Sequence, residues 1–122
     1  YWVSYYKNVS LIVNGDSKTY YAYLKVVNPA TGLPQDSQLV LYVYKANANR
    51  SLSGYPTPAP ESASYIASLN LTTTSWVNLT TIPAGGAVEI DLYVYIPEGY
   101  QLPAPVTAQL LLVYSPSSEQ PP

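Results

Sequence analysis

The chain contains no histidine, cysteine, methionine or phenylalanine. It therefore has no imidazole base, no thiolate nucleophile and no sulfur ligand for a metal ion. Charge is scarce as well, because 5 basic and 7 acidic residues make up only 10% of the 122 residues, against about a quarter in an average soluble domain. We expect a single domain that is not an enzyme, with no catalytic residues, no metal site and no bound cofactor.

The charge pattern also argues against two classes of partner. The basic residues are scattered one per segment, whereas a nucleic-acid-binding surface needs them clustered; they are Lys7, Lys18, Lys25, Lys45 and Arg50. The longest strongly apolar stretch, residues 110–114, is far shorter than the ~20 residues of a membrane-spanning helix. The chain starts at Tyr1 without a methionine or an apolar leader, so we interpret it as a mature chain and expect export.

Two groups of carboxylates deserve comparison with known kinds of site. Glu89 and Asp91 are the only close acidic pair that could serve a glycosidase, but they share one strand face with Tyr93 and Tyr95. We therefore expect them on a solvated surface. A calcium site built from Asn14, Asp16 or Asp36 lacks the required Asp-rich loop.

A chain without cysteine has no disulfides to mark an oxidising compartment. The evidence for where this protein functions therefore comes from its N-glycosylation sequons. Four of the seven asparagines lie in N-x-Ser/Thr sequences, where chance would supply about 1.3 in a chain this rich in serine and threonine; they are Asn8, Asn49, Asn70 and Asn78. Accidental matches in such a composition are the alternative. If the sites carry N-linked glycans, sugar replaces charge as the solubilising group and the chain is extracellular or on the cell surface.

Apolar and polar residues alternate along most of the sequence, which predicts strands and no helices. The segments are residues 1–13, 20–27, 39–46, 65–71, 76–82, 88–96 and 106–114. All 12 prolines fall between these segments, as expected for a sheet protein. The pattern predicts an all-β fold, an immunoglobulin-like two-sheet sandwich of about seven strands.

Strand faces follow from the same alternation. If Asn70 and Asn78 face solvent, then Leu69 and Leu79 point into the core, and Trp76 stands outside. The segment 106–114 is apolar on both faces, which predicts a central strand or an interface.

The chain carries 14 tyrosines, many at outward-facing positions. Tyrosine forms strands well, so these residues need no further role, but it also suits sugar stacking and subunit interfaces. A monomeric carbohydrate-binding or S-layer-associated module, using Trp76 and the outer tyrosines as a stacking platform, is therefore an alternative function.

The N-terminal segment is unusually apolar and aromatic for a chain end, where small domains commonly fray. It is either the first strand of its own sandwich or a donor strand that completes the sheet of the next subunit. In the second case Tyr1, Val3 and Tyr5 are the side chains that insert, within a contact set of Tyr1, Trp2, Val3, Tyr5 and Tyr6. We divide the chain into a donor strand with its lead-in (residues 1–13), a sandwich (14–115) and a polar tail (116–122).

The aromatic residues 1–6, the four sequons and the cysteine-free, charge-poor composition resemble the thread subunits of Sulfolobales and similar crenarchaeal cell-surface filaments. The resemblance covers the whole chain. It implies a glycosylated immunoglobulin-like protein of an extracellular filament, joined head to tail by N-terminal donor strands, without catalysis and with a role in adhesion or biofilm formation. The implied partners are further copies of the chain in a linear homopolymer, and surfaces or other filaments.

Overall fold

The computed structural model describes residues 2–45, 52–53, 59–60, 65–97 and 106–116, of which residues 2–9, 52–53 and 59–60 are described by their backbone only. These residues form strands and contain no helix. The strands are β1 (Trp2–Val13), β2 (Tyr20–Asn28), β3 (Gln38–Lys45), β4 (Leu52–Ser53), β5 (Ala59–Pro60), β6 (Tyr65–Asn70), β7 (Trp76–Ile82), β8 (Ala87–Ile96) and β9 (Gln109–Ser115).

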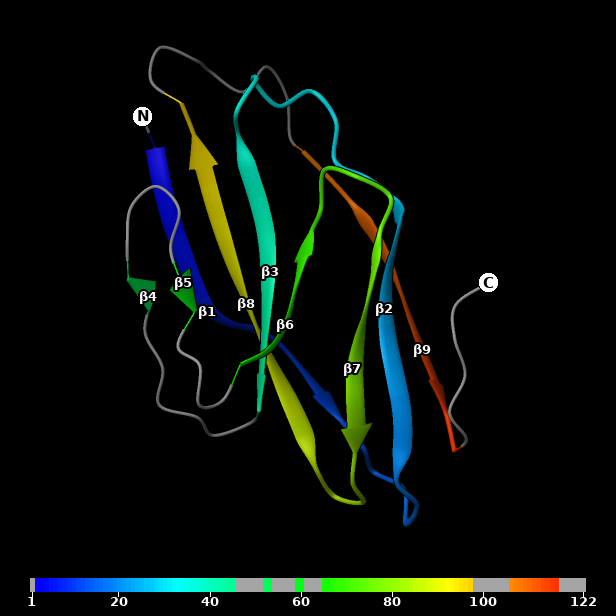
Figure 1. Cartoon of the computed structure of the whole chain (residues 1–122). Coiled ribbons are helices and arrows are strands. Elements are labelled where there is room, and N and C mark those ends of the chain that lie inside the picture. The colour runs from blue at the N-terminus through cyan, green and yellow to red at the C-terminus, as the bar shows by residue number, and fades with distance from the viewer. Residues whose placement is uncertain (1, 46–51, 54–58, 61–64, 98–105, 117–122) are drawn as a thin grey trace.

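Seven of these strands form two antiparallel sheets (Figure 1). One sheet has four strands in the order β1-β8-β3-β6, and the other has three in the order β7-β2-β9. The short strands β4 and β5 pair only with each other. The prediction of an all-β protein with two sheets is therefore confirmed.

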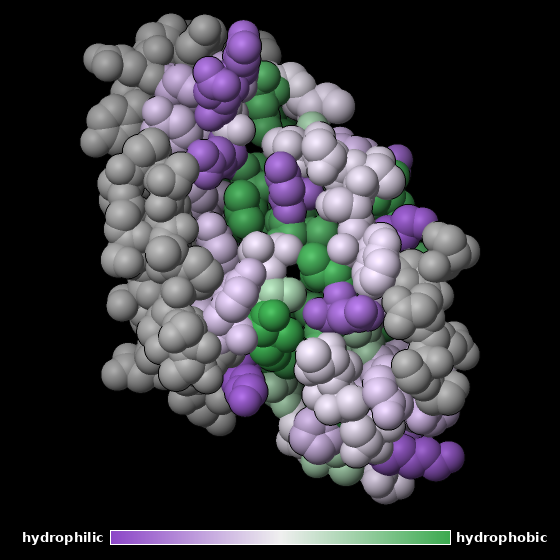
Figure 2. Space-filling view, viewed as in Figure 1, coloured by the Kyte–Doolittle hydropathy of each residue, from purple (hydrophilic) through white to green (hydrophobic). Residues whose placement is uncertain are grey.

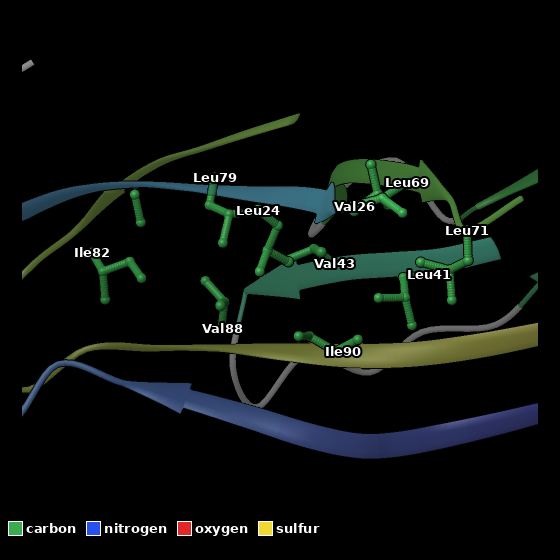
Figure 3. Packing of buried hydrophobic residues seen from close by; sticks show 11 residues of the cluster. Leu24, Val26, Leu41, Val43, Leu69, Leu71, Leu79, Ile82, Val88 and Ile90 are labelled. Atoms are coloured by element: carbon green, nitrogen blue, oxygen red, sulfur yellow. The ribbon is translucent and has the colours of Figure 1, made fainter. Parts of the chain in front are cut away.

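The core lies between the two sheets. Figure 2 shows hydrophobic side chains along the seam between them, with polar side chains on either side. Residues from β2 and β7, such as Leu24 and Leu79, point toward Val43 of β3 and Ile90 of β8 (Figure 3). Alternation dictates this arrangement, because residues two apart in a strand share a face and the apolar face of each strand can be buried only against the other sheet.

The predicted strand faces agree with the observed burial. Leu69 and Leu79 are buried, whereas Asn70 and Asn78 are exposed and Trp76 is partly exposed on the outer face. The inward series of β2, formed by Ala22, Leu24 and Val26, is also buried.

The position of β9 differs from one of the two predictions for this segment. Among the described strands, β9 pairs with β2 alone, so it is an edge strand and not a central one. An apolar run does not specify how many partners a strand has, since pairing depends on where distant segments lie. The alternative prediction, an interface, is not tested by this arrangement.

Candidate subunit interface

The N-terminal strand β1 lies at the edge of the four-stranded sheet, antiparallel to β8 of the same chain. Its pairing has two parts. Residues 2–6 pair with residues 92–96, and residues 10–13 pair with residues 87–90. Between them the three residues 7–9 of β1 stand opposite the single residue Asp91, which is a bulge. The bulge divides β1 into an outer part, residues 2–6, which we call the head, and an inner part, residues 10–13.

The inner part of β1 belongs to the domain core. Ile12 packs against the buried cluster between the sheets, and the backbone amide of the following Asn14 donates a hydrogen bond to the carbonyl of Gly86 at 2.8 Å. The sequence signals this division, because Lys7 and Asn8 interrupt an otherwise apolar segment at the position of the bulge.

The head pairs with residues 92–96 of β8, which we call the β8 strip. Side chains of this strip point alternately to the two faces of the sheet. Leu92 and Ile96 belong to the inward series of β8, and Tyr93 and Tyr95 to the outward series. The register sets Trp2, Ser4 and Tyr6 opposite Ile96, Val94 and Leu92. An edge strand here pairs with the open side of β8, so whatever segment occupies this position completes the sheet.

The outer face of the four-stranded sheet is buried around a cluster of tyrosines. Tyr42, Tyr44 and Tyr93 are buried, and Tyr65 meets Tyr44 edge to face with ring centroids 6.0 Å apart. Desolvation by burial raises the pKa of the Tyr42 hydroxyl. Tyrosine is suited to this position because its large ring is buried while its hydroxyl can still form a hydrogen bond.

The carboxylates of β8 lie on this same buried face. Asp91 has 0% and Glu89 has 8% of its surface exposed. The prediction that they line a solvated surface is therefore wrong. Alternation shows only that the two faces of a strand differ, and it does not tell whether a further layer covers the polar face.

Two of the four sequons lie at exposed positions on the sandwich. Asn70 is the last residue of β6, and its Oδ1 accepts hydrogen bonds from the backbone amide and the hydroxyl of Thr72, at 2.9 and 2.7 Å. The side-chain nitrogen, which would carry the sugar, takes no part in these bonds. Asn78 lies on the outward face of β7. Both positions leave room for a glycan.

The other two sequons are less fully described. Asn8 lies in the bulge of β1, where the backbone does not pair with β8. Asn49 lies outside the described residues.

We expect mass spectrometry of peptides from the native protein to find hexose-containing adducts on Asn70 and Asn78. Both are exposed and lie in sequons, and Asn14, which is outside any sequon and buried, is the internal control. Unmodified Asn70 and Asn78 in secreted material would contradict the glycosylation hypothesis.

The seam between the two sheets contains a cavity of about 350 Å³ beside the inner part of β1. Its apolar wall includes Ile12, Ala22 and Leu112, and Tyr114 of β9 lies at its rim. Tyr20 packs edge to face against Tyr114, with ring centroids 5.6 Å apart. This cavity was not predicted, because it is lined by residues of strands that are distant in sequence.

Polar residues at the mouth of this cavity are engaged with one another. The Nδ2 of Asn14 donates to the carbonyls of Lys18 and Ile82, at 2.7 and 2.8 Å, and the Asp16 backbone amide donates to its Oδ1. The Tyr20 hydroxyl donates to Asp16 and lowers the pKa of that carboxyl, with a further contribution from the Ser17 amide. The same bond raises the pKa of Tyr20.

These contacts are those of a structured turn. No group of three or more acidic residues that could hold a metal ion occurs among the described residues. Within the same part of the chain, no helix is long and apolar enough to cross a membrane.

The outer face of the three-stranded sheet carries a second aromatic group. Trp76 is 42% exposed, and Tyr23 packs against it at an interplanar angle of 68° with ring centroids 6.1 Å apart. Tyr21 is also exposed on this face. The two packed rings meet edge to face, so they do not form one flat platform. Asn78 lies two residues from Trp76 on the same strand face.

Comparison of the chain with protein-family models, with curated proteins and with solved structures found no significant match.

Proposed function

We propose that this chain is the structural subunit of an extracellular, pilus-like filament that grows head to tail by donor-strand complementation. The head of one copy leaves β8 of its own sheet and occupies the corresponding position on β8 of the next copy. The fold is then an immunoglobulin-like sandwich whose four-stranded sheet is completed in trans. The filament serves adhesion or biofilm formation at the cell surface.

The observation that carries this proposal is the division of β1 by the bulge at residues 7–9. A segment that can be exchanged between copies must lie at a sheet edge and must be linked to its domain by a piece of chain that can bend. The head meets both conditions, because it lies at the edge and is joined to the inner part of β1 through the bulge. Residues 10–13 stay with their own domain, where Ile12 contributes to the core.

The geometry of the exchange favours a linear polymer. Each copy has one head and one β8 strip, and these are different surfaces, so the contact is heterologous. A heterologous contact whose rotation does not close on itself generates an open chain of subunits. The partner in this polymer is another copy of the same protein.

The exposed sequons and the low charge support the proposed location at the cell surface. Asn70 and Asn78 are accessible to the enzymes that attach N-linked glycans, and a glycan layer would keep a chain with so few charges in solution.

The alternative of a monomeric carbohydrate-binding module is favoured by one observation, the partly exposed Trp76 beside Tyr23. A glycan on the neighbouring Asn78 would lie over this aromatic pair and compete with an external sugar. The edge-to-face packing also offers less flat area for stacking than two coplanar rings. We therefore favour the filament.

Electron microscopy of protein isolated from the surface of its native cells distinguishes the two functions. We expect fibres with one subunit per repeat along their length, because each head binds the next copy. A preparation that contains only single globular particles would support the binding module and contradict the filament.

A further inference from the structure

The edge strand β9 differs from the other three edges of the two main sheets. Edge strands expose unpaired backbone groups to which another strand can add, and proteins commonly block this with charges, prolines or bulges. The edge strands β1, β6 and β7 each contain a bulge: residues 7–9 in β1, Ile66 in β6, and the stretch around Thr80 in β7, which has a positive φ of 62°.

No such protection occurs within β9, because the register shift of this pairing, between Val26 and Asn28, adds a residue to β2 and not to β9. Residues 110–115 pair with six consecutive residues of β2 without a shift in register. The strand contains no charged residue and no proline, and its sequence is Gln-Leu-Leu-Leu-Val-Tyr-Ser. No other described strand pairs with its far side. It is therefore a straight, uncharged edge that can accept another strand.

The side chains of β9 are also exposed where they ought to be buried. Leu110 and Tyr114 stand opposite Val26 and Ala22, which belong to the inward series of β2, so they lie on the core side of the sheet. Nevertheless Leu110 is 40% and Tyr114 64% exposed. Leu111, on the outer side, is 49% exposed. Both faces of β9 thus present apolar surface at the open side of the sandwich, next to the cavity that Leu112 and Tyr114 help to line.

We infer that β9 is a lateral contact between two copies of this chain, in which it pairs antiparallel with β9 of the second copy across a two-fold axis at Leu112. A two-fold contact places each residue opposite its symmetry counterpart. About Leu112 this pairs Leu110 with Tyr114 and Leu111 with Val113. Apolar residues therefore meet apolar residues across the contact.

The lack of charge in and around β9 favours a second copy of the chain as its partner. In a self-pair, any charged residue near the axis would approach its own copy and repel it. Residues 106–116 contain no charge at all, so two copies of β9 can approach each other without repulsion between like charges. The pairing joins two three-stranded sheets into one and covers Leu110 and Tyr114 of both copies. In a filament of these subunits it holds two threads side by side, and it does not use the head.

Cysteine cross-linking tests the register directly, because the natural chain contains no cysteine. Two full-length variants, Leu110→Cys and Tyr114→Cys, are produced separately and co-expressed, then oxidised and run on a denaturing gel. Directly opposed residues of an antiparallel pair lie within disulfide range, whereas residue 110 of one copy is distant from residue 110 of the other. We expect a covalent dimer in the co-expressed sample and only single chains when either variant is alone.

The matched control is co-expression of Leu110→Cys with Thr81→Cys, which places the second cysteine on the exposed edge strand β7. Thiols that face each other in a paired state react on the order of a hundredfold faster than thiols that meet by collision at micromolar concentration. Dimer formation no faster than in this control would overturn the inference. A dimer from either variant alone would show a different register and would overturn it as well.

A disrupting variant gives a second measurement. Leu111→Lys puts a charge on the pairing edge, and we expect it to reduce cross-linking between the 110 and 114 cysteines at least about tenfold, whereas Thr81→Lys leaves it unchanged. Equal cross-linking in both backgrounds would contradict the lateral contact. Since covalent dimers are scored separately from fibres, failure of this inference and failure of the filament proposal give different results.

Discussion

A chain that lacks residues 1–6 is expected to form no fibres, whereas the full-length chain does. The deletion removes the strand that pairs with the outer edge of β8 at residues 92–96, where β3 pairs with residues 92–95 on the other side. The outer edge of β8 is then unpaired there, and no copy has a head to offer the next. Electron microscopy of full-length and truncated proteins, secreted from the same cells, measures the effect.

Two controls separate loss of the donor from general damage. Removal of residues 117–122, six residues at the other end, is expected to leave fibres intact. Addition of a synthetic peptide of residues 1–13 to the truncated chain is expected to give a soluble one-to-one complex and no fibres, because the peptide fills the β8 strip but carries no sandwich to extend the polymer. Fibres of normal appearance from the truncated chain would show that another contact builds the filament.

The fold was largely predictable because its strands alternate strictly. In β2 and β8 every second residue is aliphatic, so the inward faces could be assigned from sequence, and burial of Ala22, Leu24 and Val88 agrees. The exposed sequons Asn70 and Asn78 gave an independent check on β6 and β7. Local patterns of this kind depend only on the geometry of a single strand.

The order of the strands and the burial of the outer face of the four-stranded sheet could not be predicted in the same way. The edge position of β9 and the pairing of β1 with β8 depend on contacts between residues more than seventy positions apart, which periodicity does not encode. The burial of Asp91 was missed for a related reason, since the polar face of a strand looks the same in sequence whether it faces water or another layer.

The candidate interface was predicted in part. The aromatic N-terminal segment and its interruption at Lys7 and Asn8 were visible in the sequence, and the bulge falls at this interruption. The strip on β8 that receives the head was not, because any of several apolar strands could have been its partner. The register between β1 and β8 places that strip at residues 92–96.

The two contacts proposed for this protein use different edges and have different symmetry. The head and β8 form a heterologous contact that extends one thread, and β9 forms a two-fold contact between threads. A subunit with both would build paired threads. The sequon asparagines Asn70 and Asn78 lie on β6 and β7, away from the β8 strip and the β9 edge in strand order, so the glycans proposed for them would leave both contacts free.

The central claim is that the head binds the next copy, and a double variant, Ser4→Cys with Val94→Cys, tests it most directly. These positions are register partners in β1 and β8, and the chain has no other cysteine. The variant is isolated as fibres, oxidised and analysed on a denaturing gel, with Ser4→Cys and Thr81→Cys as the unpaired control. A disulfide joins two cysteines only when their Cα atoms are within about 7 Å, so the bond reports which chain supplies the head.

If the head is donated, each disulfide links one subunit to the next, and the gel shows a ladder of dimers, trimers and longer covalent chains that reducing agent collapses to a single band. The unpaired control shows no ladder. If instead the oxidised fibres yield only single chains closed by an internal disulfide, the head remains in its own sheet and donor-strand assembly of this protein is wrong.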